Sequence, residues 1–123
     1  MLRLRPLEAL YPYRLAAPRA DAFGLALYSR LPLGAAQAID LETTAAIDAE
    51  ILTPAGPFRL LGVHLRPPTR PGWLAERNRQ LAALEALRAA HAGPLVVVGD
   101  FNATPYSPYM SAWLRATGLR TTL

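Results

Sequence analysis

A short apolar strand that ends in polar residues constrains the fold of this chain most strongly. Residues 95–98 (Leu-Val-Val-Val) form a continuous apolar run between Gly93-Pro94 and Gly99. Such a run predicts a strand buried on both faces of a sheet. Asp100 and Asn102 follow and, in an extended segment, project to the same side. A carboxylate beside an apolar core must be paired, hydrogen-bonded or metal-bound, so we expect a functional site here.

The rest of the chain predicts more strands and two helices. Short apolar or alternating segments predict strands over residues 23–28, 37–41, 45–52 and 58–65. A leucine stripe predicts a helix over residues 73–92, with residues 77–80 on its solvent-exposed side and Gly93-Pro94 as its stop. These elements predict one α/β domain with a mixed sheet.

The boundaries of a second helix are also visible in the sequence. Ser107-Pro108 is a favourable N-cap and first position, and Gly118 is a favourable end. Residues 119–123 then predict the beginning of a strand.

Composition restricts the class of protein. The chain has 123 residues, 52% of them hydrophobic, which predicts a globular domain. It has no cysteine, so disulfides and thiolate chemistry are excluded. No apolar run approaches the roughly 20 residues of a membrane span. All 13 basic residues are arginine and the net charge is +4, which suits a polyanionic partner, although the charge is spread along the chain.

Five sequence blocks occur together in one order. They are Tyr-Pro-Tyr at 11–13, Asp-Ala-Phe-Gly-Leu-Ala-Leu-Tyr-Ser-Arg-Leu-Pro-Leu at 21–33, Gly-Val-His-Leu-Arg-Pro-Pro at 62–68, Arg-Asn-Arg-Gln-Leu at 77–81 and Gly-Asp-Phe-Asn-Ala-Thr-Pro at 99–105. This pattern resembles the endonuclease/exonuclease/phosphatase superfamily, which has a deoxyribonuclease-like fold, and a bacterial branch of it in particular. The resemblance extends from about residue 11 to residue 118.

The resemblance implies a fold and an activity. The implied fold is a four-layer α/β/β/α sandwich with mixed, largely antiparallel sheets. The implied activity is that of a phosphodiesterase or nuclease, a hydrolase that uses Mg²⁺ or Mn²⁺ and an activated water to cleave phosphate esters. Asp100 matches the family's aspartate that activates this water close to the metal, and Asn102 matches the asparagine that holds a phosphate oxygen. His64 matches the histidine that donates to the phosphoryl oxygen.

Other interpretations of these residues stay open from the sequence. His64 on an apolar strand is also compatible with a core histidine, and Asp100 with Asn102 could cap a turn. Arg30 could face the phosphate or pair with Asp21 or Asp40. Arg66 could steer a phosphate or be solvated.

The chain also departs from the family pattern. It lacks the metal-holding glutamate that follows an asparagine on the first strands, and the closing Asp-His pair on the last strand. Glu8 lies in a helical pattern instead. We therefore expect a single partial domain over residues 1–123, without the N-terminal and C-terminal strands, as a fragment, a truncated reading frame or a degenerate copy. One carboxylate would hold Mg²⁺ weakly, so little or no activity is expected from the chain alone.

Two further hypotheses follow. The chain could be a non-catalytic module that folds with a partner, or as a dimer that covers open sheet edges. It could also bind nucleic acid through Arg66, Arg70, Arg77 and Arg79. For the parent protein we expect a bacterial source. We expect it to be cytoplasmic, or membrane-associated through segments that are not in this chain.

Overall fold

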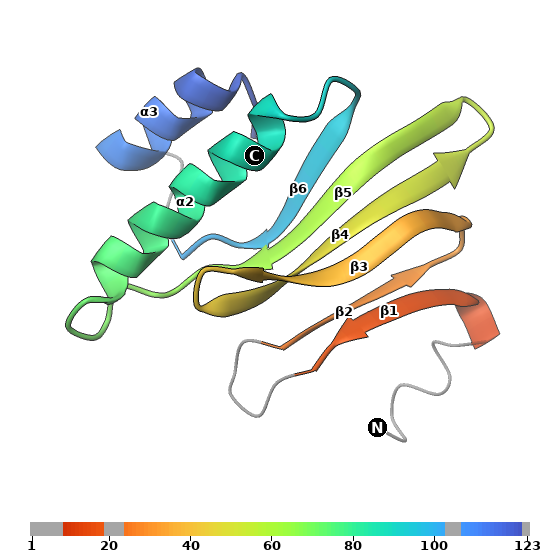
Figure 1. Ribbon diagram of the computed structural model, residues 1–123, viewed down its shortest axis with the longest axis horizontal. Coiled ribbons are helices and arrows are strands. Elements are labelled where there is room, and N and C mark those ends of the chain that lie inside the picture. Colours follow the sequence, from red (N-terminus) through yellow and green to blue (C-terminus); the bar gives the residue numbers. More distant parts are fainter. Residues whose placement is uncertain (1–8, 19–23, 103–106, 122–123) are drawn as a thin grey trace.

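A four-stranded mixed sheet is the centre of the structure, a computed structural model that describes residues 9–18, 24–102 and 107–121 (Figure 1). The elements in chain order are β1 (Tyr13–Ala17), β2 (Leu25–Ser29), β3 (Leu33–Leu41), β4 (Thr44–Thr53), β5 (Gly56–His64), α2 (Trp73–Ala89), β6 (Leu95–Asp100) and α3 (Pro108–Thr117). The main sheet has the order β3-β4-β5-β6, and β1 and β2 form a separate antiparallel pair. The predicted α/β class with a mixed sheet is confirmed.

Strand direction changes once within the main sheet. The pairs β3–β4 and β4–β5 are antiparallel, whereas β5 and β6 run parallel because α2 forms the crossover between them. Among the described helices, none is long and apolar enough to cross a membrane.

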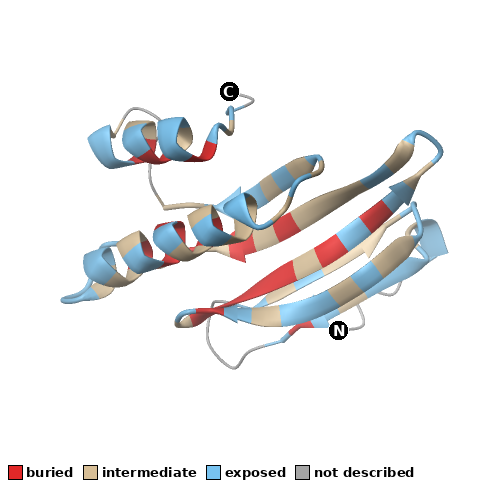
Figure 2. Ribbon diagram, turned by 45° about the horizontal axis from the view of Figure 1, so that its top comes forward, coloured by how far each residue is buried: buried red, intermediate tan, exposed pale blue. Residues whose placement is uncertain are grey.

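The two faces of the main sheet are covered by different layers. On β4, Ala45, Ile47, Ala49 and Ile51 are buried toward the β1–β2 pair, as their alternation with Asp48 and Glu50 predicts. The opposite face is covered by α2 and α3, and its core joins residues of β5 to Leu81, Leu84, Met110 and Trp113. Figure 2 shows the buried bands along β4 and β5.

The prediction that residues 95–98 are buried on both faces is wrong. Val96 and Val98 are 47% and 50% exposed, and only Leu95 and Val97 pack against the helix-side core. The reason is position: β6 is the outer strand of the sheet that the structure describes. The β1–β2 pair lies over β3, β4 and β5 and does not extend to this side of β6.

The exposed side of α2 was also predicted incorrectly. Leu74, expected in the buried stripe, is 51% exposed, whereas Arg77 and Gln80, expected in solvent, are 7% and 0% exposed. Three hydrogen bonds offset the cost of burying the Gln80 amide. Its Nε2 donates to the Leu41 carbonyl at 2.9 Å and the Thr44 hydroxyl at 2.8 Å, and its Oε1 accepts from the Arg66 amide at 2.9 Å.

Three smaller differences concern element boundaries. Strand β1 covers Tyr13–Ala17, a segment for which the sequence predicts no strand. Phe23, predicted to begin the next strand, lies outside the described residues, and β2 begins at Leu25. Residues 119–121 form no strand. The predicted caps of α3 are confirmed: the Ser107 hydroxyl accepts from the Met110 amide, and Gly118 ends the helix in the left-handed conformation.

The burial of Gln80 gives a prediction about stability. Replacing Gln80 by leucine keeps the volume but removes the side-chain hydrogen bonds to the Arg66 amide, the Leu41 carbonyl and the Thr44 hydroxyl. We expect Gln80→Leu to lower the free energy of unfolding by about 2 to 4 kcal/mol in urea denaturation. Arg79→Leu, at an exposed position of the same helix, should change it by less than about 0.5 kcal/mol. Equal losses in the two variants would contradict this account.

Candidate active site

His64 and Asp100 lie side by side at the carboxyl ends of two parallel strands. They end β5 and β6, and they are direct partners in the register of this pair. The distance from His64 Nε2 to Asp100 Oδ2 is 3.8 Å. The Asp100 side chain is 62% exposed and the His64 side chain 26% exposed. The crossover through α2 thus places an imidazole beside a carboxylate that solvent can reach.

The backbone that follows Asp100 turns sharply and holds its carboxylate. The Asn102 amide donates to Asp100 Oδ1 at 2.8 Å, and Asn102 has a φ of 49°, in the left-handed region that asparagine tolerates. Asp100 therefore caps a turn, which was one of its two interpretations. The cap engages Oδ1 and leaves Oδ2 on the side of His64, so the turn orients the carboxylate.

Asn102 is fixed at two further atoms. Its side-chain Nδ2 donates to the Leu65 backbone carbonyl at 2.8 Å. Its backbone carbonyl accepts from Arg77 Nη1 at 3.2 Å. Since Leu65 follows His64 directly, the first contact joins the two strand ends. An amide nitrogen carries two hydrogens, so one N–H of Nδ2 remains for a ligand.

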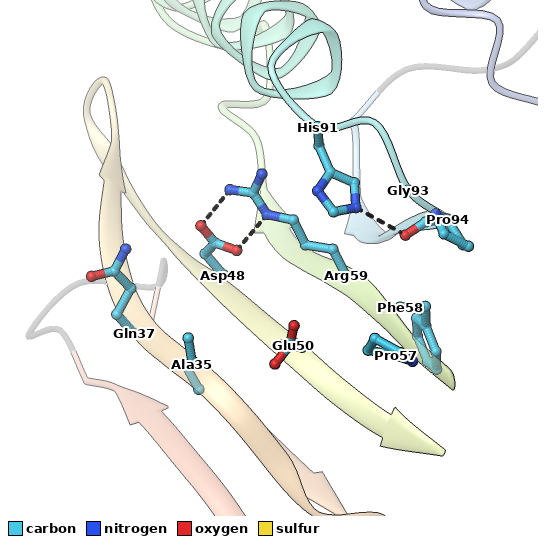
Figure 3. Close-up of a pocket in the computed structure, with 11 residues that line it drawn as sticks. Ala35, Gln37, Asp48, Glu50, Pro57, Phe58, Arg59, His91, Gly93 and Pro94 are labelled. Carbon is cyan, nitrogen blue, oxygen red and sulfur yellow. Dashed lines mark hydrogen bonds and ion pairs between the residues drawn. The ribbon is translucent and has the colours of Figure 1, made fainter. Parts of the chain in front are cut away.

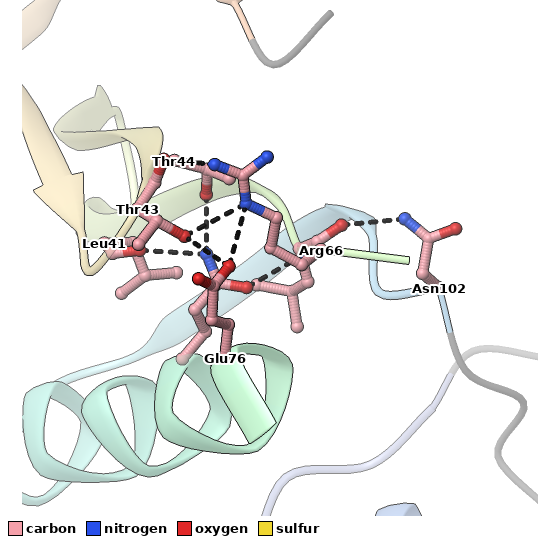
Figure 4. Close-up of polar contacts among 8 residues, drawn as sticks. Leu41, Thr43, Thr44, Arg66, Glu76 and Asn102 are labelled. Carbon is pink, nitrogen blue, oxygen red and sulfur yellow. Dashed lines mark hydrogen bonds and ion pairs between the residues drawn. The ribbon is translucent and has the colours of Figure 1, made fainter. Parts of the chain in front are cut away.

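Arg66 takes part in a polar network (Figure 4). Its Nε lies 3.3 Å from Glu76 Oε2 and donates to the Thr43 hydroxyl at 3.0 Å, while Nη2 donates to the Thr43 carbonyl at 3.1 Å. Its guanidinium also lies 4.8 Å from the centre of the Trp73 ring. These contacts tie the segment after β5 to the β3–β4 turn and to α2. In this arrangement Arg66 is an anchor whose charge is balanced by Glu76.

The structure does not bring Arg30 together with these residues. Its guanidinium lies 5.2 Å from the centre of the Tyr11 ring, a cation–π contact. Of its two predicted partners, Asp21 lies outside the described residues, and no ion pair joins Arg30 to Asp40 within the described part of the chain. Glu8, the glutamate in the N-terminal helical pattern, also lies outside the described residues.

The sequence interpretation missed Gln80 and Glu76 as supports of this site, and it placed Arg77 on the solvent-exposed side of the helix although the family resemblance allowed an arginine here to support the neighbouring loop. A signal was available for Gln80, because it lies four residues before Leu84 and therefore on the same side of the helix as the buried leucine. Polar residue types had suggested exposure instead.

Comparison with known proteins identifies the family. The sequence profile described as the Endonuclease/Exonuclease/phosphatase family matches residues 2–122. The chain belongs to this family. No curated protein sequence resembles the chain closely enough to count as a match.

Several solved structures share the fold. Sphingomyelinase C from Streptomyces griseocarneus superposes with a TM-score of 0.78 at 16% identity, over 96% of this chain and 52% of that one. A double mutant of beta toxin from Staphylococcus aureus, with bound magnesium ions, gives 0.74 at 13% identity, over 94% and 52%. The endonuclease/exonuclease/phosphatase from Beutenbergia cavernae gives 0.68 at 20% identity, over 93% and 38%. The chain spans about half the length of the first structures it matches.

The described residues bring only one carboxylate to the site that could take part in holding a metal ion. Within the ranges 9–18, 24–102 and 107–121, no three His, Asp or Glu side chains come together. Asp100 contributes one carboxylate, and Glu76 is held by Arg66 and by the hydroxyl of Thr43. Magnesium in proteins takes an octahedral shell of oxygen ligands, and one carboxylate supplies too little of it.

A cavity lies at the end of the main sheet opposite to His64 and Asp100, and it contains none of the predicted catalytic residues. It has a volume of about 840 Å³ and is lined by Gln37, Asp48, Glu50, Arg59 and His91, among others (Figure 3). Arg59 Nε donates to Asp48 Oδ1 at 2.7 Å, and this hydrogen bond raises the pKa of the Arg59 guanidinium. Asp48 neutralises Arg59 and Glu50 adds a carboxylate, so the cavity offers no surplus positive charge for phosphate.

The conformation of Asn102 leads to a prediction at the site. We expect Asn102→Ala to lower stability more than Asn102→Gly, by about 1 kcal/mol, because only glycine adopts a positive φ without steric cost. Both variants lose the side-chain contact to Leu65, so their difference isolates the backbone term. Thermal denaturation of the two proteins under the same conditions measures it. Identical melting temperatures would show that the left-handed conformation at this position is not retained.

Proposed function

We propose that this chain carries the phosphate-binding and proton-handling residues of a metal-dependent phosphoesterase of the phosphodiesterase or nuclease type. The observation that supports this most directly is the pairing of His64 with Asp100 at adjacent strand ends, 3.8 Å apart, with Asn102 fixed beside them. Membership of the endonuclease/exonuclease/phosphatase family supports the same reaction class.

Each of the three residues supplies one element of phosphoryl transfer. The carboxylate of Asp100, with Oδ2 directed to the side of His64, accepts a hydrogen bond from the attacking water and orients it. His64 Nε2–H donates to the phosphoryl oxygen on which charge accumulates, and the remaining N–H of Asn102 Nδ2 holds a second phosphate oxygen. Reactions of this kind depend on positioning and electrostatic stabilisation rather than on a covalent nucleophile.

We place the divalent cation, Mg²⁺ or Mn²⁺, in the complete domain. The beta toxin structure with bound magnesium ions supports this cofactor for the family. We also propose the four-layer sandwich for the complete domain, to which this chain contributes the main sheet, its two helices and part of the second sheet.

Nucleic-acid binding through a row of arginines is not favoured by the geometry. Arg77 is buried beneath Asn102, and Arg66 is balanced by Glu76. Arg70 lies against the Trp73 ring. These side chains do not form one accessible basic surface, so we propose no substrate more specific than a phosphate ester.

Phosphate binding at His64 can be tested without turnover. The chain has two histidines, His64 and His91, and His91 lines the cavity at the other end of the sheet. Titration with dimethyl phosphate in the presence of Mg²⁺ should shift the His64 ring signals in proton–carbon NMR spectra and leave those of His91 in place. Asn102→Gly should weaken this binding at least about tenfold, since a charge-assisted hydrogen bond is lost. Equal shifts of the two rings, or none, would contradict the proposed site.

Hydrolysis tests whether the described residues suffice for activity. We expect the purified chain to hydrolyse bis-p-nitrophenyl phosphate in Mg²⁺ no faster than the buffer does, because one carboxylate does not complete a metal site. Mg²⁺-dependent hydrolysis that is lost in Asp100→Ala and kept in Asp40→Ala would contradict this expectation. It would show that the site is already complete, and the hydrolase proposal would then be strengthened.

A further inference from the structure

The ring of Trp73 has two guanidinium groups against it. The guanidinium carbon of Arg66 and that of Arg70 each lie 4.8 Å from the centre of the ring. Stacking of this kind orders a long side chain by a cation–π attraction, and it leaves the N–H groups at the edge of the guanidinium plane available for hydrogen bonds. The two arginines differ in how they use these N–H groups.

The N–H groups of Arg66 are occupied within the protein. Its Nε pairs with Glu76 and the Thr43 hydroxyl, and its Nη2 donates to the Thr43 carbonyl. Arg70 is exposed, and its guanidinium makes no hydrogen bond or ion pair with the residues that the structure describes. Of the two cations on Trp73, Arg70 is therefore the one whose charge and donors are accessible to a ligand.

The loop that carries Arg70 restrains its backbone. Three residues of this loop, between positions 67 and 72, are proline, which fixes φ at each of them. The Thr69 amide donates to the Pro67 carbonyl at 2.8 Å, and the Trp73 amide donates to the Arg70 carbonyl at 3.1 Å. Because the backbone and the side chain are both restrained, Arg70 loses less conformational entropy when it binds an anion.

This loop begins at the proposed phosphate site. Arg70 lies six positions after His64, so the Cα atoms of the two residues are at most about 20 Å apart. Contacts also connect them. The Leu65 carbonyl accepts from Asn102 Nδ2, and Arg66, the next residue, lies against the ring that orders Arg70. A phosphate held at His64 and Asn102 therefore has an ordered cation on the same loop.

We propose that Arg70, ordered by Trp73, binds a second phosphate group of the substrate, beyond the phosphate ester at His64. This inference rests on the proposed function and narrows its substrate to phosphate esters that carry a further phosphate group. A cation at this position attracts an anionic substrate without pairing with the Asp100 carboxylate that orients the water. Arginine suits this role because its planar donors bind two phosphate oxygens at once.

The first test compares ligands with one and two phosphate groups. The one-phosphate ligand is dimethyl phosphate. The two-phosphate ligands are pairs of methyl phosphate groups joined by spacers of one to four ethylene glycol units, which cover a range of separations. In Mg²⁺, the best of them should bind the complete chain at least about tenfold more tightly than dimethyl phosphate, because the second contact is intramolecular. Chemical shifts of the His64 ring measure both affinities.

Two arginine variants show where the gain arises. Arg70→Gln should remove the gain and leave the affinity for dimethyl phosphate unchanged. Arg79→Gln is the matched control and should keep the gain, because it removes the same charge from an exposed position of α2. If dimethyl phosphate binds at His64, a gain that is absent with every spacer, or equal in the two variants, would overturn this inference alone. No shift of His64 with any ligand would overturn the proposed function and this inference with it.

The second test examines the Trp73 ring. The chain has two tryptophans, and Nε1 of Trp113 donates to the Leu81 carbonyl in the core. The best two-phosphate ligand should shift the indole N–H signal of Trp73 in proton–nitrogen NMR spectra and leave that of Trp113 in place. Trp73→Leu should lose most of the affinity gain, whereas Trp73→Phe, which retains a ring, should keep most of it. Circular dichroism confirms that each variant is folded. An undiminished gain in Trp73→Leu, or equal shifts of the two indoles, would contradict the role of the ring.

Discussion

The parallel pairing of β5 with β6 is the constraint on which the rest of the structure depends. His64 and Asp100 are 36 positions apart in the sequence, yet they are register partners at the same edge of the sheet. This pairing requires the α2 crossover, and α2 in turn requires an apolar face against β5, which Leu81 and Leu84 provide. The same hydrophobic packing that closes the core therefore also assembles the candidate site.

Helix α2 contributes more than packing, because its two buried polar side chains hold the two loops of the site. Gln80 binds the Arg66 amide just after β5, and Arg77 binds the Asn102 carbonyl just after β6. Burial of a guanidinium and an amide is costly unless they are hydrogen-bonded. One Arg77 atom, Nε, has no partner. The cost of burying Arg77 with one unpaired atom is consistent with a helix that positions the loops of the site as well as covering the sheet.

The sequence predicted the features that depend on neighbouring residues. It did not predict the features that depend on contacts between distant segments. The strand before Asp100, the caps of α3 and the alternation along β4 depend on neighbouring residues, so the sequence alone revealed them. Exposure of Val96 and Val98 depends on which strands flank β6, and an apolar run contains no such information. Arg77 and Gln80 were misplaced for a related reason: their burial depends on carbonyl and amide partners from other elements.

The apolar sequence of β6 and its exposure in the structure do not agree. The match to sphingomyelinase C covers 96% of this chain and 52% of that protein. The apolar pattern of β6 suits a strand with neighbours on both sides, whereas the described residues supply one. The exposure of Val96 and Val98 therefore reflects the strands that the described residues place beside β6, and not the residue types of β6 itself.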